Sequence, residues 1–280
     1  MRKALFFALI ALVALPLVAQ QPPVKYPAIS QHASVSQTVG LTDVTITYSR
    51  PGVKGRQIWG ALVPYDKPWR TGANEATTIT FSDDVTISGQ KLAKGKYAFF
   101  AIPTQTDWTL IFNTVSDQWG SFGYDAAKDA LKVTVKPQRA LFTEWLTYEF
   151  PNVSSDSATI VLRWENLAIP FTVNTGTTAK VIAAAREAVA NAKPDDWSTP
   201  NRAASFAFNN GLNEDATKWL DVSLKAKETI QNLYLKARIQ AKAGNKAAAV
   251  KTAELALAKA GEKDKELAGE IQASIKEWQK

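Results

Sequence analysis

Hydrophobic and polar positions follow two different periods along this chain of 280 residues. From about residue 35 to residue 173 they alternate, as in "DVTITYS", where Val44, Ile46 and Tyr48 share one face. Alternation of this kind is typical of strands with one buried face. "KYAFFAIP" and "WTLIFN" are apolar on both faces, which is typical of central strands. Turn residues separate these stretches, so we expect about nine short strands in an antiparallel, jelly-roll-like β-sandwich over residues 35–176.

After residue 176 the pattern becomes helical. "ETIQNLYLKARIQAKAG" carries an apolar stripe that begins at Ile230, and Gly244 follows it as a helix terminator. A shift of 33 residues aligns Gly211 with Gly244 and Ala216 with Ala249. Helical hairpins with this period resemble tetratricopeptide repeats. We therefore expect an α+β multidomain protein whose residues 177–280 form an all-α, tetratricopeptide-like helical hairpin array. An unrelated helical bundle is the competing interpretation.

The N-terminus has the three parts of a secretory signal peptide. Arg2 and Lys3 precede an apolar run over residues 4–18, which is shorter than the ~20 residues of a membrane-spanning helix. We expect a signal peptide over residues 1–19, cleaved after Ala19 and followed by an extended segment over residues 20–34. The mature protein would then be periplasmic or secreted, with no stable membrane insertion. An uncleaved membrane anchor is the competing interpretation.

The composition excludes several chemistries. Cysteine is absent, so disulfides, thiol nucleophiles, thiolate metal sites and a lipoprotein anchor are ruled out. His32 is the single histidine, so a Ser-His-Asp triad would depend on it alone. The chain has neither a G-x-S-x-G nucleophile motif nor a Gly-rich phosphate loop leading from a strand into a helix. We predict no catalytic residues, no metal site and no cofactor.

The net charge of +7 divides unevenly along the chain. Residues 20–176 carry 14 Lys and Arg against 13 Asp and Glu, and residues 177–280 carry 17 against 13. No segment has a run of five or six like charges, which is the usual mark of a nucleic-acid-binding tail. We therefore expect no nucleic-acid partner.

A long connection between two predicted strands carries the most distinctive polar chemistry. About 25 residues rich in Gly, Pro, Arg and aromatics separate the strands, and connections of that length tend to be functional. Its arginines offer planar forks for carboxylates or phosphates, and Trp59, Tyr65 and Trp69 offer rings for stacking on sugars. The candidate residues are Arg50, Arg56, Trp59, Trp69, Arg70, Asn74 and Glu75.

The same residues also fit a purely structural role. A buried or half-buried Arg70–Glu75 ion pair, with Asn74 bonded to backbone, would tie the connection to the sheet. Arg50, just before Pro51, could act in the same way. The sequence leaves the ligand site and the structural tie as alternatives.

A second candidate segment is the aromatic, glycine-rich stretch "SDQWGSFGYD". Its rings are Trp119, Phe122 and Tyr124. Exposed aromatics among glycines are typical of carbohydrate-binding loops, whereas buried ones would serve core packing. Both interpretations stay open at this point.

Four stretches give the chain a family resemblance. "YSRPGVKGRQIWG", "LVPYDKPWRTGANEATTITF", "GKYAFFAIP" and "WTLIFN" closely resemble the bacterial family called domain of unknown function 2911. The resemblance covers roughly residues 30–173. It implies an exported, mostly β domain that is often followed by helices, and it implies no activity.

Two functions from different classes follow from these observations. The first is a non-catalytic envelope module whose sandwich binds a glycan or small anionic ligand and whose helices bind a protein. The alternative is a hydrolase that acts on envelope or external polysaccharide through two carboxylates at about 5–10 Å in one cleft. None of the carboxylates in or beside loops belongs to a known catalytic motif. They are Asp66, Glu75, Asp83, Asp84, Asp117 and Asp125.

Overall fold

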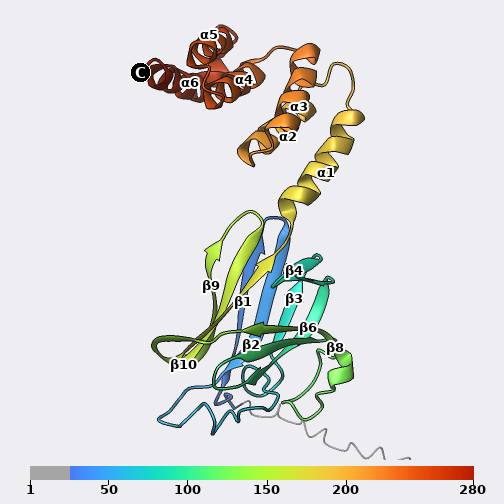
Figure 1. Cartoon of the computed structure of the whole chain (residues 1–280), viewed down its shortest axis with the longest axis vertical. Helices are drawn as coiled ribbons and strands as arrows, with labels where there is room; N and C mark the ends of the chain where they lie inside the picture. Colours follow the sequence, from blue (N-terminus) through green and yellow to red (C-terminus); the bar gives the residue numbers. More distant parts are fainter. Residues whose placement is uncertain (1–25) are drawn as a thin grey trace, which may run out of the picture.

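The computed structural model describes residues 26–280, which form a two-sheet β domain followed by six α-helices (Figure 1). The predicted signal peptide and its cleavage site lie outside the described residues. The α+β class, the antiparallel sandwich and the helical array are confirmed, and neither sheet closes into a barrel. In Figure 1 the helices lie beyond one end of the sandwich and the long connection lies at the other end.

One sheet has six antiparallel strands and the other has four. In spatial order, the larger sheet consists of β1 (Gln31–Val39), β2 (Thr42–Arg50), β3 (Thr78–Phe81), β6 (Gly95–Pro103), β7 (Trp108–Asn113) and β8 (Asp129–Val135). The smaller sheet consists of β5 (Gln90–Leu92), β4 (Val85–Ile87), β10 (Ser157–Asn174) and β9 (Gln138–Val153).

The sandwich core follows the alternation of the sequence. Val44, Ile46 and Tyr48 of β2 are buried, while Thr45 and Thr47 between them are only partly covered. Each fully buried large apolar side chain contributes about 1.5–3 kcal/mol. The alternation therefore fixes which face of each strand points inward.

The central strands are buried on both faces, as their sequences predict. Phe100 and Ile111 lie on the outer face of the six-stranded sheet, in a small cluster with Ala76 and Tyr124. These last two residues belong to the two candidate loops. The loops therefore cover the sheet, and part of their sequence is set by that packing.

One strand is longer than any single alternating stretch of the sequence. "ATIVLRW" and "LAIPFTV" each alternate, and both belong to the single strand β10. The pairing of β10 with β9 shifts register on both sides of Glu165, whose φ is 54°. A β-bulge of this kind bends a strand without ending it. The alternation is therefore interrupted at the bulge although the strand continues.

The helices form two hairpins between a linking helix and a closing helix. The six are α1 (Thr177–Ala190), α2 (Ser198–Asn209), α3 (Asn213–Ala226), α4 (Ile230–Lys242), α5 (Lys246–Leu257) and α6 (Lys265–Trp278). Short 3₁₀ turns lie at Ala126–Lys128 and Glu262–Asp264. Gly211 and Gly244 follow α2 and α4 with φ of 78° and 85°, a conformation that glycine adopts without strain. Ala216 and Ala249 are both fully buried, in agreement with the 33-residue period.

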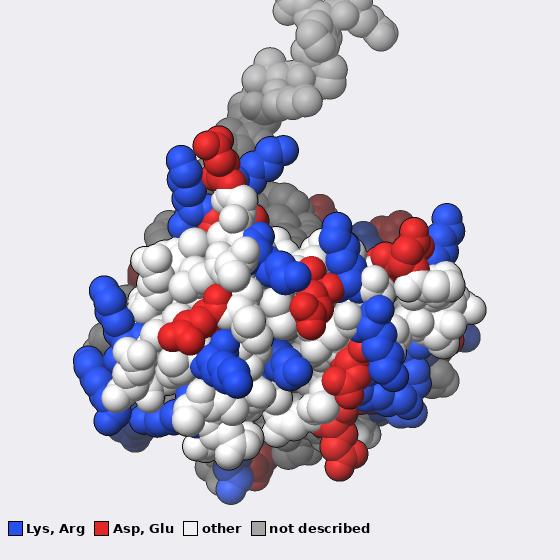
Figure 2. Space-filling model, turned by 90° about the horizontal axis from the view of Figure 1, so that it is seen from above, with Lys and Arg blue, Asp and Glu red and all other residues white. Residues whose placement is uncertain are grey.

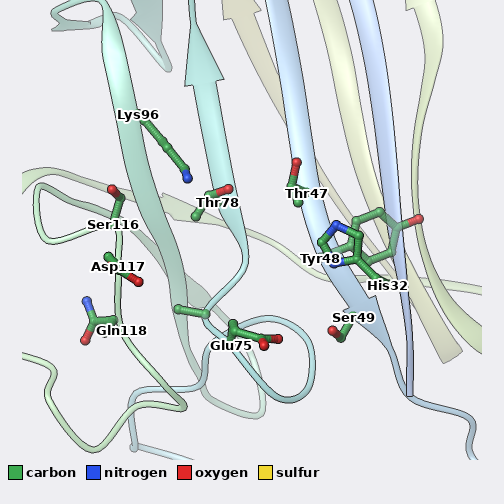
Figure 3. A pocket seen from close by; sticks show the side chains of 11 residues that line it. His32, Thr47, Tyr48, Ser49, Glu75, Thr78, Lys96, Ser116, Asp117 and Gln118 are labelled. Carbon is green, nitrogen blue, oxygen red and sulfur yellow. The ribbon is translucent and has the colours of Figure 1, made fainter. Parts of the chain in front are cut away.

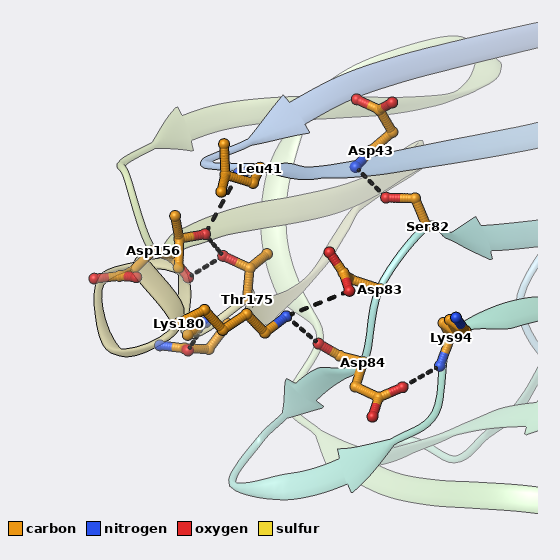
Figure 4. Close-up of polar contacts among 12 residues, drawn as sticks. Leu41, Asp43, Ser82, Asp83, Asp84, Lys94, Asp156, Thr175 and Lys180 are labelled. Atoms are coloured by element: carbon orange, nitrogen blue, oxygen red, sulfur yellow. Dashed lines mark hydrogen bonds and ion pairs between the residues drawn. The ribbon is translucent and has the colours of Figure 1, made fainter. Parts of the chain in front are cut away.

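Side-chain contacts fasten α1 to the sandwich (Figure 4). The Asp156 carboxylate accepts hydrogen bonds from the backbone N–H (2.6 Å) and hydroxyl (2.5 Å) of Thr178. The Lys180 Nζ lies 3.7 Å from Asp83 Oδ1 and donates to the Asp84 carbonyl at 3.3 Å. Gly40 has no room for a side chain, because a Cβ there would lie 2.1 Å from the Thr177 hydroxyl. The first helix therefore has a defined attachment.

The surface charge is mixed. Figure 2 shows a face of the molecule on which Lys and Arg side chains are interspersed with Asp and Glu. The positive excess is therefore spread over that face. No helix within residues 26–280 is both long enough and apolar enough to cross a membrane.

Candidate functional site

The connection over residues 51–77 is ordered by backbone pairing with distant parts of the sandwich. Trp69 exchanges two backbone hydrogen bonds with Ala101 of β6, both 2.8 Å long. Gly52 pairs with Trp145 of β9, and Glu75 pairs with Trp119. The two segments that the sequence singled out therefore lie side by side. Paired backbone of this kind holds side chains in fixed positions despite the irregular sequence.

Four tryptophans meet where the connection covers the sandwich. Trp59 lies edge-on to Trp69, Trp108 and Trp164, at centroid distances of 5.7, 4.9 and 5.7 Å. Trp69 and Trp164 stack with an interplanar angle of 17°. Trp69, Trp108 and Trp164 are buried, and Trp59 is partly exposed. Trp59 and Trp69, which are predicted site residues, thus pack in this cluster and also line cavities.

The 70–77 loop is tied down by neutral groups. The buried Thr71 donates its hydroxyl proton to the Phe99 carbonyl at 2.7 Å and accepts the Tyr148 hydroxyl on its own carbonyl at 2.9 Å. Asn74 Nδ2 donates to the Ser30 carbonyl at 3.0 Å. Thr71 has a φ of 50°, which is uncommon for a β-branched residue. Such strain persists only where the surroundings over-determine the backbone, as they do here.

The predicted Arg70–Glu75 ion pair is wrong. No ion pair within residues 26–280 joins the two side chains. The chain passes through left-handed conformations at Thr71 and Asn74 (φ of 50° and 57°), and Glu75 pairs its backbone with Trp119. Arg70 consequently lines one cavity and Glu75 lines another. The tie exists, but Asn74 and Thr71 make it.

The first cavity, which we call the arginine cavity, has a volume of about 290 Å³. Its walls include Lys54, Arg56, Trp69, Arg70 and Trp164, and none of its lining residues is acidic. Arg70 Nε and Trp164 Nε1 are both buried and have no hydrogen-bond partner within the described chain. Two unpaired donors therefore border one cavity that holds cations and no carboxylate.

The other predicted arginines are already occupied. Arg56 donates from Nε to the Val53 carbonyl at 3.1 Å and from Nη2 to the Gly52 carbonyl at 2.5 Å. Arg50 donates to the Leu146 carbonyl at 2.9 Å and so links β2 to β9. Their guanidinium groups help to hold the backbone. Arg70 differs, since no side-chain hydrogen bond or ion pair of this residue occurs within residues 26–280.

Burial acts on the charge of Arg70. It lowers the pKa of the guanidinium below its ordinary value, because the charged form loses hydration. A neighbouring carboxylate would raise the pKa again, but no such group lines the cavity. An external anion would supply the missing counter-charge and, through its oxygens, hydrogen-bond acceptors. The arrangement is thus suited to bind a carboxylate, phosphate or sulfate group.

The second cavity, which we call the carboxylate cavity, has a volume of about 320 Å³. Figure 3 shows Asp117 on one side of the hollow, His32 on the other and Glu75 between them, with Lys96 above. Glu75 and Asp117 are both exposed. The sequence named both carboxylates as candidates, but it gave no signal that His32 of β1 and Lys96 of β6 would join them. That grouping depends on strand register.

The aromatic loop divides between surface and core. Trp119 and Phe122 are 61% and 90% exposed. Tyr124 packs edge-on against Phe100 at 5.3 Å and donates its hydroxyl to Asp129 at 2.7 Å. Burial, the hydrogen bond and the charge of Asp129 all raise the pKa of Tyr124. Two of the three rings are therefore free for contacts with other molecules, and the third is structural.

A residue of the arginine cavity that sequence reasoning missed comes from β10. Trp164 lines the arginine cavity, yet in "ATIVLRW" it is an ordinary apolar strand position. It lies more than 90 residues after Arg70, so no local pattern relates the two. Within the described part of the chain, no group of three His, Asp or Glu side chains is placed to hold a metal ion.

The comparisons with known proteins identify the family. The family described as "Protein of unknown function (DUF2911)" matches residues 30–173, and the chain belongs to it. No curated protein matches the chain, and no solved structure does. The match covers the sandwich and ends before the helices begin.

Proposed function

We propose that this protein is an exported, non-catalytic binding module whose sandwich binds a small anionic ligand in the arginine cavity. Its destination would be the periplasm or the cell exterior, on the strength of the N-terminal sequence. The helical hairpins would bind a protein partner. The connection that carries Arg70 and the helices lie at opposite ends of the molecule in Figure 1, so the two partners would not compete for space.

The observation that carries this proposal is the pair of unsatisfied donors at Arg70 and Trp164. A buried donor without an acceptor costs about 1–3 kcal/mol, and more where the group is charged. No acidic residue of the described chain lines the cavity of Arg70, so residues 26–280 offer no carboxylate there to offset this cost. An anion in the cavity would offset it through a charge-assisted interaction.

The tied loop supports the proposal because it positions Arg70 in advance. Trp69 pairs with β6, and its indole nitrogen donates to the Gly72 carbonyl at 3.3 Å. Thr71, the next residue after Arg70, is anchored to Phe99 and Tyr148. A cation held on rigid backbone loses little conformational entropy when it binds a ligand. The strained Thr71 is consistent with a backbone selected for placing its neighbour.

Calorimetry on the mature chain tests the proposal. We expect inorganic phosphate, sulfate or glucuronate to bind with saturation and to raise the melting temperature. Arg70→Ala should abolish this effect. Lys67→Ala is the matched control, because Lys67 is exposed, lies three residues away and lines neither cavity. Equal binding by the Arg70→Ala variant, or no binding of any of the three anions, would contradict the proposal.

A second candidate function is favoured by one observation, the placement of Glu75 and Asp117 around a single cavity. A glycosidase needs two carboxylates that flank the scissile bond. Both side chains are exposed, however, whereas a catalytic acid is usually sheltered in apolar surroundings. The test is release of reducing ends from polysaccharides by the wild type, by Glu75→Gln and by Asp117→Asn. Turnover that is lost in both variants would favour the hydrolase over the binding module.

A further inference from the structure

A third cavity lies on the other side of the four-tryptophan cluster, beside the bulge in β10. We call it the bulge cavity; its lining includes Trp59, Tyr65, Gln105, Arg139, Glu165 and Asn166. Its volume of about 630 Å³ is roughly twice that of the arginine cavity or the carboxylate cavity. Neither the family match nor the proposed anion site accounts for it.

Two aromatic rings in this cavity remain partly exposed and are held in place. Trp59 packs edge-on against the buried Trp108 at 4.9 Å. Tyr65 lies against Gly60, where a Cβ would come within 2.8 Å of the tyrosine ring. Gly60 has a φ of 81°, so the tight turn and the ring position both require glycine. Rigid, amphipathic rings of this kind provide contact area at a low entropic cost.

The polar groups of the cavity are also fixed in advance. Glu165 accepts the Trp59 indole N–H on Oε2 at 3.0 Å and the Asn166 amide on Oε1 at 2.7 Å. Glu165 has a φ of 54° at the point where β10 shifts register. A bulge with a strained, non-glycine residue re-aims its side chain, and it persists where the surroundings support it. Here it places a carboxylate and an amide next to an aromatic ring.

The charges of the bulge cavity differ from those of the arginine cavity. Arg139 and Glu165 balance one another in sign, and the remaining polar side chains, which include Gln105 and Asn166, are neutral. A charged ligand therefore gains little net attraction. A polyhydroxylated ligand gains more, because its hydroxyl groups both donate and accept hydrogen bonds. Its C–H face can also lie on the exposed aromatic rings.

We propose that the bulge cavity binds a neutral saccharide. A pyranose ring would stack on Trp59 and Tyr65, while its hydroxyl groups would bond to Gln105, Glu165 and Asn166. This site is distinct from the anion site of Arg70 and does not depend on it. The tryptophan cluster separates the two, since Trp59 and Trp108 line one cavity while Trp69 and Trp164 line the other.

Titration of the mature chain with neutral tetrasaccharides tests this inference. The panel would contain tetramers of β-1,4-glucose, α-1,4-glucose, N-acetylglucosamine, mannose and xylose, followed by calorimetry and tryptophan fluorescence. We expect saturable binding of at least one tetramer. Tyr65→Ala and Asn166→Ala should each weaken it at least tenfold, and circular dichroism would check that both variants fold. Arg70→Ala tests whether the tetramer occupies the arginine cavity instead, and Lys67→Ala, at an exposed position outside the linings of all three cavities, is the control that should keep wild-type affinity.

Three results would overturn the inference. The first is a lack of binding across the whole panel. The second is binding that survives both Tyr65→Ala and Asn166→Ala. The third is loss of tetramer binding in Arg70→Ala, which would place the sugar in the arginine cavity. Failure of the anion site would appear separately, because the titrations with phosphate, sulfate and glucuronate report on Arg70 and those with neutral sugars report on Tyr65.

Discussion

The two sides of the 70–77 loop differ sharply although only four residues lie between Arg70 and Glu75. On the Arg70 side the wall includes two tryptophans and three cations, and two buried donors lack acceptors within residues 26–280. On the Glu75 side the wall carries both signs of charge, and its charged side chains are exposed. The difference shows that backbone anchoring, rather than charge attraction, decides where these side chains go. A tied loop can therefore hold a cation unpaired.

The largest expected effect is a difference in the free energy of unfolding between variants of Trp69, in the four-tryptophan cluster, and Trp119, in the aromatic loop. Trp69→Ala should destabilise the fold by about 3–5 kcal/mol, because it leaves a cavity in the four-tryptophan cluster. Trp119→Ala should change stability by less than about 0.5 kcal/mol, because Trp119 is 61% exposed. Urea unfolding of both variants measures the difference. Similar losses for the two would mean that the aromatic loop is as much part of the core as the cluster.

A smaller effect is expected where Asn74 ties the loop. Asn74→Ala should cost about 1–2 kcal/mol, because it removes the bond to the Ser30 carbonyl and places alanine at a φ of 57°. Asn152→Ala is the matched control, at an exposed position on β9. The same urea titrations apply. If Asn74→Ala equals the control, the loop is held by backbone pairing alone.

Alkaline pH should lower the stability of the fold through Tyr148, whose hydroxyl anchors Thr71 next to Arg70. Burial raises the pKa of Tyr148, so the folded protein keeps this proton above pH 10, where tyrosine in the unfolded chain loses it. The unfolded state then binds fewer protons, and stability falls as pH rises above about 10, by about 1.4 kcal/mol per pH unit. Tyr148→Phe should remove that part of the slope. Parallel pH profiles of unfolding for the two proteins would contradict the assignment.

The smallest expected effect is the coupling between Arg70 and Glu75. The two side chains line different cavities, so a double-mutant cycle should give a coupling below about 0.5 kcal/mol. Arg70→Ala alone should not destabilise the fold and should stabilise it slightly, because it removes a half-buried guanidinium whose Nε has no hydrogen-bond partner within residues 26–280. A coupling of several kcal/mol would instead support an ion pair between Arg70 and Glu75.

Local periodicity is what made much of the fold predictable. The burial of Val44, Ile46 and Tyr48 in β2 follows from alternation within five residues. Gly211 and Gly244 mark the ends of α2 and α4, because helix termination is also a local property. Such features need no knowledge of the rest of the chain.

The candidate sites were less predictable because they depend on distant register and on unusual dihedral angles. The positive φ values of Thr71, Asn74 and Glu165 send side chains where sequence spacing does not. A glycine in a sequence indicates that a positive φ is possible, whereas a threonine or a glutamate does not. Trp164, on β10 of the four-stranded sheet, reaches the arginine cavity only because the two sheets pack against one another. The types of residue at the candidate sites were therefore easier to predict from the sequence than the residues that they contact.

Phosphate titration followed by NMR of side-chain N–H groups tests the central claim most directly. The claim is that the arginine cavity binds a small anion. It predicts saturable shifts of the Arg70 Nε–H and Trp164 Nε1–H signals, and none at the exposed Trp119 indole. Signals at Arg70 and Trp164 that stay unmoved, or that shift without saturation in step with Trp119, would contradict it.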